Sequence, residues 1–68
     1  MNRQDQDLPD RLIDAKELHR LIPVSSMTIW RWERDQRFPA RIRIGANRVA
    51  WRLSEILAWI EAKADARD

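Results

Sequence analysis

A proline stands between two short segments with helical spacing, and it constrains the fold more than any other residue. Pro23 cannot continue a helical hydrogen-bond ladder and disfavours helical geometry at Ile22, so a first helix must end near Leu21. Ser25 then offers a hydroxyl N-cap for a second helix, which leaves only three or four residues between the two helices. Two short helices joined this tightly are predicted to form a helix-turn-helix.

The first of these helices has a clear start and one apolar face. Asp14 is the expected N-cap, and Glu17, three residues later, completes a pair that resembles a capping box. Helical spacing places the apolar side chains of this segment together: Ala15, Leu18, Leu21 and Ile22.

The second helix is predicted over residues 26–35 and has two different faces. At about 100° per residue, Ile29 and Trp32 point inward. The opposite face carries a cluster of large and basic side chains: Met27, Trp30, Arg31 and Arg34.

The rest of the chain predicts a β-hairpin and a third helix. Residues 41–44 alternate arginine and isoleucine with period two, residues 45–47 suit a short turn, and residues 48–52 form the return strand. The expected inward side chains are Ile42, Ile44, Val49 and Trp51. The expected outward ones are Arg41, Arg43, Arg48, Ala50 and Arg52. A helix to about residue 64 follows from the spacing of Leu53, Ile56, Trp59, Ile60 and Lys63.

The fold class is therefore α+β, mainly α, with the order helix, helix, β-hairpin, helix over residues 11–64. Residues 1–10 are polar, acidic and aperiodic, which predicts a disordered N-terminal tail. Residues 65–68 are expected to fray. A chain of 68 residues forms one small domain with little net stability, and its four tryptophans can bury much of the available core area.

The composition argues against an enzyme. One histidine, one glycine and no cysteine leave few catalytic groups, no Gly-rich phosphate loop and no thiolate metal ligand. His19 falls between core positions and is interpreted as a surface residue. No apolar run approaches the roughly 20 residues that span a bilayer, and the N-terminus does not resemble a signal peptide. We therefore expect a cytoplasmic protein with no cofactor, metal ion or small-molecule ligand.

Positive charge is concentrated in the middle of the chain. Residues 25–52 contain seven arginines against only Glu33 and Asp35, whereas carboxylates outnumber basic residues on either side. A net charge of +2 therefore conceals a strongly cationic segment with acidic flanks. This distribution is typical of a protein that binds nucleic acid.

The outer face of the second helix has two interpretations. It can be an ordinary charged surface on which Glu33 and Asp35 pair with nearby arginines. Against this stands Trp30, because an aromatic side chain opposite the core exposes apolar area unless a partner covers it. Guanidinium groups bind phosphates and guanine edges, and an aromatic can pack on a sugar or a thymine methyl. We favour DNA contact by Met27, Trp30, Arg31 and Arg34, with Ser25 and Ser26 directed at a phosphate.

The hairpin arginines also have two interpretations. Outward basic residues protect a strand edge from aggregation. However, no acidic residue lies between Arg37 and Arg52, which is more positive charge than edge protection needs. We therefore favour a wing that touches the DNA backbone or minor groove through Arg41 and Arg43, with Asn47 and Arg48 at its tip.

The order of these motifs resembles a known family. The motifs are Thr28-Ile29-Trp30-Arg31-Trp32, Arg37-Phe38-Pro39, Ile44-Gly45-Ala46-Asn47-Arg48-Val49-Ala50-Trp51, Ser54-Glu55-Ile56 and Ala58-Trp59-Ile60. Over residues 12–62 they are similar to the AlpA-type phage regulators, within the excisionase-like, MerR-like winged helix-turn-helix proteins. The resemblance implies a prophage-encoded or mobile-element DNA-binding domain, with Ser26, Thr28, Trp30 and Arg31 on the recognition helix and Arg48 on the wing.

Two positions depart from the family pattern. Gln36 stands where the family usually has glycine, so a left-handed conformation there would carry strain of about 1 kcal/mol. Leu57 occupies a position that is commonly polar, and it either extends the core or forms a small contact patch.

Three functions stay open at this point. The first is a transcriptional regulator of prophage or mobile-element genes, which binds double-stranded DNA as a monomer in solution or a weak dimer on DNA. The second is an excisionase that acts with an integrase. The third is a protein-interaction module that binds an integrase or RNA polymerase through Leu57 and Trp30.

Overall fold

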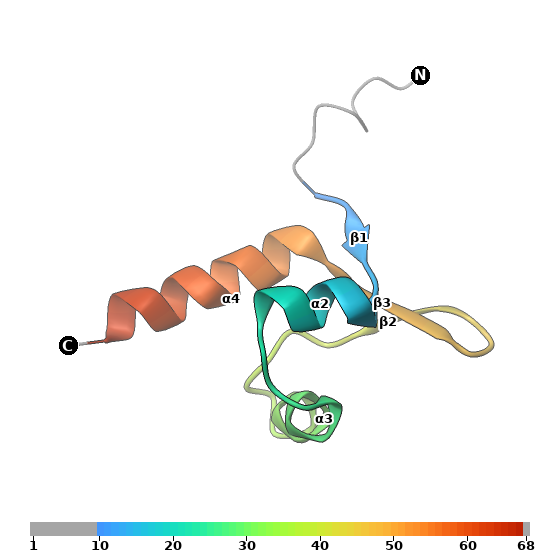
Figure 1. Cartoon of the computed structure of the whole chain (residues 1–68), viewed down its shortest axis with the longest axis horizontal. Helices are drawn as coiled ribbons and strands as arrows, with labels where there is room; N and C mark the ends of the chain where they lie inside the picture. The colour runs from blue at the N-terminus through green and yellow to red at the C-terminus, as the bar shows by residue number, and fades with distance from the viewer. Residues whose placement is uncertain (1–9, 68) are drawn as a thin grey trace.

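Three helices and a three-stranded antiparallel sheet make up the part of the chain that can be described. The computed structural model describes residues 10–67. Its elements follow in chain order: β1 (Leu12–Ile13), α2 (Ala15–Leu21), α3 (Ser26–Arg34), β2 (Ile42–Gly45), β3 (Arg48–Arg52) and α4 (Leu53–Ala66). The predicted order of helix, helix, hairpin and helix is confirmed. In Figure 1, α4 and the β2–β3 hairpin extend to opposite sides of the molecule, and α3 lies below both.

A third strand was not predicted. The sheet order is β1-β3-β2, so residues 12–13, which precede the first helix, pair with β3. Leu12 lies opposite Arg52 and Ile13 opposite Trp51. The backbone N–H of Leu53 also donates to the carbonyl of Arg11 at 2.7 Å. The start of the domain is therefore tied to the point where β3 becomes α4.

The first helix begins as predicted, although its second capping contact differs. The Asp14 carboxylate accepts a hydrogen bond from the Glu17 backbone N–H at 2.9 Å. The Glu17 carboxylate does not return to Asp14 and pairs with Arg11 at 2.9 Å. Leu18 and Ile22 are buried as expected, but the predictions for Ala15 and Leu21 are wrong because both are exposed. A helix of seven residues buries a narrower stripe than its apolar spacing suggests.

The β2–β3 hairpin contains a bulge that the sequence did not predict. Ile42 lies opposite Ala50, Arg43 opposite Val49 and Gly45 opposite Arg48, which leaves Ile44 as the extra residue of the bulge. The inward prediction for Ile44 is wrong, since this residue is 49% exposed, whereas Ile42 is half-buried.

Ala50 is a further correction on β3. It was expected to point outward into solvent, yet only 3% of its surface is exposed. Its neighbour Trp51 is buried as predicted and belongs to the main core. β3 is the central strand of the sheet. Its small Ala50 side chain is therefore covered by residues of the strands on either side, β1 and β2.

The core draws on every helix and on the central strand. Its fully buried members are Ile13, Leu18, Ile22, Ile29, Phe38, Trp51 and Ile56. Trp32 and Trp59 pack against it, with ring centroids 5.5 Å apart, and Phe38 meets Trp59 edge to face at 4.9 Å. The Trp59 indole N–H donates to the Arg37 carbonyl at 2.9 Å. This aromatic cluster fastens α4 to the segment that follows α3.

Asp10 corrects the predicted boundary of the tail. Residues 1–9 of that tail lie outside the described residues, but the Asp10 carboxylate accepts from the Ser54 hydroxyl at 2.9 Å and from Arg52 at 2.6 Å. The N-cap residue of α4, Arg52, makes no side-chain capping hydrogen bond. The Asp10 carboxylate, 44 residues before Ser54, instead binds the Ser54 hydroxyl in the first turn of this helix. The Ser54 hydroxyl and then the Arg52 guanidinium hold the pKa of Asp10 below its ordinary value of 3.8.

α3 and α4 end within two residues of their predicted positions. α4 continues to Ala66, close to the predicted end at about residue 64. α3 ends at Arg34, and Gln36 adopts the left-handed conformation with φ of 59°. The Gln36 N–H donates to the Glu33 carbonyl and the Arg37 N–H to the Trp32 carbonyl, which is a Schellman motif. A non-glycine residue therefore closes the helix.

Gln36→Gly should stabilise the domain. Glycine adopts positive φ without the clash that a Cβ creates, so we expect the free energy of unfolding to rise by about 1 kcal/mol. Gln36→Ala is the matched control, since it keeps the Cβ and should give no such gain. Urea denaturation followed by tryptophan fluorescence measures both. Equal stability of the glycine and alanine variants would show that the conformation carries no strain.

Asp10→Asn should change how stability depends on pH. Because the folded pKa of Asp10 is lowered, its contribution is fully present above pH 3.8 and is lost as pH falls through the lower folded value. The parent should therefore exceed the variant in thermal stability at neutral pH, and the gap should close in acid. Ser54→Ala should reproduce part of this effect. Parallel curves for parent and Asp10→Asn would contradict the assignment.

Candidate nucleic-acid interface

The N-terminus of α3 is held by hydroxyl contacts within the protein. The Ser25 hydroxyl accepts from the Thr28 backbone N–H at 3.1 Å, as the predicted N-cap requires, and lies 3.0 Å from the Thr28 hydroxyl. The Ser26 hydroxyl lies 3.1 Å from Nε2 of His19 on α2. His19, which was interpreted as a residue of a solvated face, thus connects the two helices of the helix-turn-helix.

The outer face of α3 is as exposed as its spacing predicted. Ile29 is buried and Trp32 packs on the core, whereas Met27 is 58% and Trp30 is 48% exposed. The Arg34 guanidinium lies over the Trp30 ring, 5.1 Å from its centroid. Arg31 is exposed beside them. Two apolar side chains and two guanidinium groups therefore project from one side of this helix.

Glu33 joins α3 to the hairpin, a role that sequence reasoning missed. One carboxylate oxygen accepts from Nε of Arg41 at 2.8 Å, and the other accepts from the Trp51 indole N–H at 2.9 Å. The Glu33 side chain is only 11% exposed. The Arg41 guanidinium also lies over the Trp51 ring, 5.3 Å from its centroid. The only prior signal was an acidic residue within a run of arginines.

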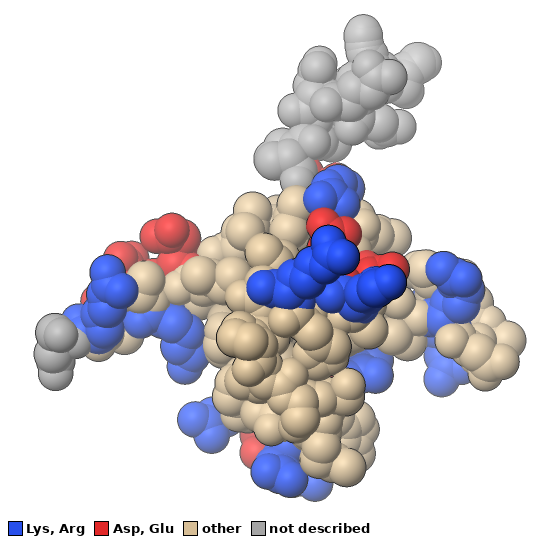
Figure 2. All heavy atoms as spheres, viewed as in Figure 1, with Lys and Arg blue, Asp and Glu red and all other residues tan. Residues whose placement is uncertain are grey.

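The seven arginines of residues 25–52 fall into two groups. Arg41 and Arg52 pair with shielded carboxylates, those of Glu33 and Asp10. Arg34 meets Asp35 only at 3.5 Å, and both side chains are largely exposed. Within residues 10–67, no ion pair holds Arg31, Arg37, Arg43 or Arg48. In Figure 2, basic atoms lie on the hairpin and below α3, and further basic atoms lie beside acidic ones in the centre of the view and along α4.

The tip of the hairpin is also exposed. Asn47 and Arg48 line a shallow hollow of about 330 Å³ together with Asp14 and Lys16 at the start of α2. Arg43 is exposed further along β2. The wing residues therefore form a basic edge beside the helix-turn-helix, and Asn47 adds an amide that can donate or accept.

A hollow of about 400 Å³ connects the outer face of α3 with the base of the hairpin. We name it the Met27–Trp30 hollow, and its lining consists of Ser26, Met27, Trp30 and Arg41. It brings together four of the predicted site residues from two elements of the fold. Thr28 lies beside it but is partly buried and bonded to Ser25, so it contributes mainly to the helix start.

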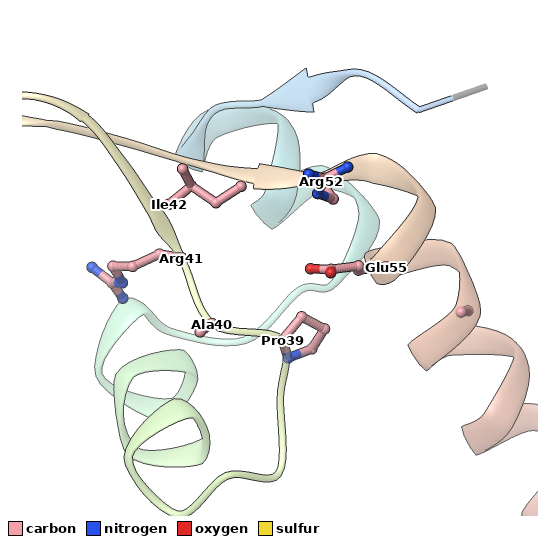
Figure 3. A pocket seen from close by; sticks show the side chains of 7 residues that line it. Pro39, Ala40, Arg41, Ile42, Arg52 and Glu55 are labelled. Atoms are coloured by element: carbon pink, nitrogen blue, oxygen red, sulfur yellow. The ribbon is translucent and has the colours of Figure 1, made fainter. Parts of the chain in front are cut away.

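A second hollow lies on the other side of the Arg41 segment. It has a volume of about 760 Å³, and its lining includes Pro39, Ala40, Ile42, Arg52 and Glu55. Figure 3 shows the Arg41 side chain pointing away from this hollow toward α3, whereas Ile42 points into it. Arg52 is already bound to Asp10, so this hollow offers mainly small apolar side chains. It does not unite the predicted DNA-binding residues.

Within residues 10–67, the structure has no group of three His, Asp or Glu side chains that could hold a metal ion. The same part of the chain contains no helix with the length and apolar character needed to cross a membrane.

The two adjacent helices, the β2–β3 hairpin and the exposed face of α3 are compatible with a small winged helix-turn-helix fold. Residues 11–64 match the family described as prophage CP4-57 regulatory protein (AlpA), and the chain belongs to this family of phage regulatory proteins. It is also 33% identical over 64 residues to the uncharacterized protein ORF88 of Enterobacteria phage P4. That similarity covers 88% of this chain and 73% of the phage P4 protein. The resemblance of the sequence motifs to the AlpA family is confirmed.

Glu33→Ala should destabilise the domain by about 1–3 kcal/mol, because it leaves the buried Trp51 indole N–H without an acceptor and Arg41 without its partner. Glu33→Gln keeps one acceptor and should cost less. Asp35→Ala is the control, since exposed ion pairs such as that with Arg34 contribute little. Denaturant unfolding measures all three variants. Equal effects of Glu33→Ala and Asp35→Ala would contradict the role of Glu33.

Proposed function

We propose that this protein is a sequence-specific DNA-binding regulator of prophage or mobile-element genes. The observation that carries the proposal is the exposed face of α3, where Arg31 has no ion pair within residues 10–67 and lies beside Trp30 and Met27. Membership of the AlpA family supports it, since the matching family is described as regulatory. In this mechanism α3 enters the major groove, as the second helix of a helix-turn-helix does.

The dimensions of α3 suit this docking. An α-helix with its side chains is about 10–12 Å in diameter, and a B-DNA major groove about 12 Å wide admits it. The core-facing residues of α3 leave one side of the helix free for this contact. Arg31 would contact base edges, and Arg34, stacked on Trp30, would reach an adjacent phosphate.

The wing has a different role in this mechanism. Arg43 and Arg48 are exposed basic residues on the hairpin, and Asn47 lies between them at the turn. They would grip the neighbouring backbone and add affinity without reading sequence. Arg41 is directed back toward Glu33, so we assign it mainly to fixing the wing beside α3 and less to phosphate contact. The Ser25 hydroxyl is likewise engaged as the N-cap, which leaves its backbone and that of Ser26 for a phosphate.

Arg31→Ala and Arg48→Ala should weaken DNA binding in different ways. Arg31→Ala should weaken binding to the selected site by about 1–3 kcal/mol and leave unrelated DNA nearly unchanged, because a base contact carries sequence information. Arg48→Ala should weaken both and reduce the slope of log affinity against log salt by about 1, as one phosphate contact requires. Salt titrations on sites selected from random DNA measure both effects.

Arg20→Ala is the matched control for these two variants, because Arg20 is an exposed arginine of α2 outside the proposed interface. It should change neither affinity nor the salt slope. Equal effects of Arg20→Ala and Arg48→Ala, or normal site binding by Arg31→Ala, would overturn the proposal. Footprinting then separates a promoter regulator, which occupies one operator, from an excisionase, which occupies adjacent repeated sites beside an integrase attachment site.

A further inference from the structure

The Met27–Trp30 hollow is an apolar feature at the centre of a face otherwise made of arginines. Met27 and Trp30 are three residues apart on α3, so their side chains are neighbours on the helix surface. Both remain about half exposed in a domain that buries its other tryptophans wholly or in part. An exposed apolar pair in this position needs a partner that is itself apolar.

The walls of the hollow are held in place by contacts outside it. Arg41 is fixed by Glu33 at 2.8 Å and by stacking on Trp51. Arg34 covers part of the Trp30 ring, and the Ser26 hydroxyl is bonded to His19. A site whose walls are already ordered loses little conformational entropy when it is filled. Three of the four lining side chains are therefore held by contacts outside the hollow.

The surface that faces α3 in a major groove offers few apolar groups. Base edges there present hydrogen-bond donors and acceptors, and the 5-methyl group of thymine is the apolar exception. A polar base edge pressed against Met27 and Trp30 would lose water without gaining a hydrogen bond. A methyl group loses no hydrogen bond there and buries apolar area on both partners.

We propose that the Met27–Trp30 hollow binds the 5-methyl group of a pyrimidine base, either thymine or 5-methylcytosine. This inference rests on the proposed docking of α3 in the major groove. Arg31, one residue beyond Trp30, places a guanidinium beside the recess, so a base that follows or precedes the methylated pyrimidine can be read at the same time. The hollow then makes one position of the operator depend on a methyl group rather than on a hydrogen bond.

Replacement of each thymine of the selected site by deoxyuridine tests thymine as the source of the methyl group. At one position in each bound site, affinity of the parent protein should fall about fourfold, which corresponds to the roughly 0.8 kcal/mol of one buried methyl group. A second arm places cytosine or 5-methylcytosine at that position, and the methylated base should bind about fourfold more tightly. A site at which neither methyl group changes affinity would overturn the inference.

Met27→Ala should abolish this sensitivity. The variant should bind thymine and uracil sites equally well, because half of the recess is gone, and its thermal melt should match the parent since Met27 is exposed. Leu57→Ala is the matched control: Leu57 is 43% exposed on α4, and its loss should leave the fourfold ratio intact. Arg31→Ala should weaken binding but keep the ratio. Sequence-specific binding without any methyl effect defeats this inference alone, whereas absence of sequence-specific binding defeats the proposed function as well.

Discussion

The carboxylate of Glu33 is the contact on which the relation between helix and wing depends. It accepts from the Arg41 guanidinium and the Trp51 indole, and so connects α3 to the segment before β2 and to the central strand. A carboxylate that is only 11% exposed is costly unless its oxygens are bonded, and here each oxygen has a donor. The geometry that satisfies it also fixes the direction of the hairpin relative to α3. A small change at this residue would therefore reach both halves of the proposed interface.

The arginines in the cationic middle of the chain have two different roles. Arg41 is bound to Glu33, eight residues earlier, and Arg52 is bound to Asp10, 42 residues earlier, so only the second pair joins segments far apart in sequence. Arg31, Arg43 and Arg48 are exposed and hold no ion pair within residues 10–67. Net charge alone treats all of these as equivalent. Carboxylates already occupy Arg41 and Arg52, so the salt dependence of DNA binding should reflect fewer charges than the seven arginines of residues 25–52.

Local signals in the sequence predicted the helices and the hairpin well. They did not predict the contacts between residues far apart in sequence. The caps at Asp14 and Ser25 and the inward residues of α3 follow from a few neighbouring residues. The bulge at Ile44 does not, because a strict alternation of side chains fits both registers and only the packed sheet selects one. The Asp10–Ser54 and Glu33–Trp51 contacts join residues 44 and 18 positions apart, and no spacing rule connects such pairs. For the same reason, the exposed face of α3 was predictable but the hollow formed with Arg41 was not.

The nine residues of α3 divide the requirements of folding and recognition between separate positions. Ile29, Trp32 and Glu33 are engaged with the core, the aromatic cluster and the hairpin, so substitutions there act first on stability. Met27, Trp30 and Arg31 are exposed and contribute little to the packed interior. Substitutions at these outer positions can change which bases are contacted while leaving the helix in place. If α3 is the reading helix, this fold can acquire a new operator preference through three side chains without a new core, which suits a domain whose small size leaves little stability in reserve.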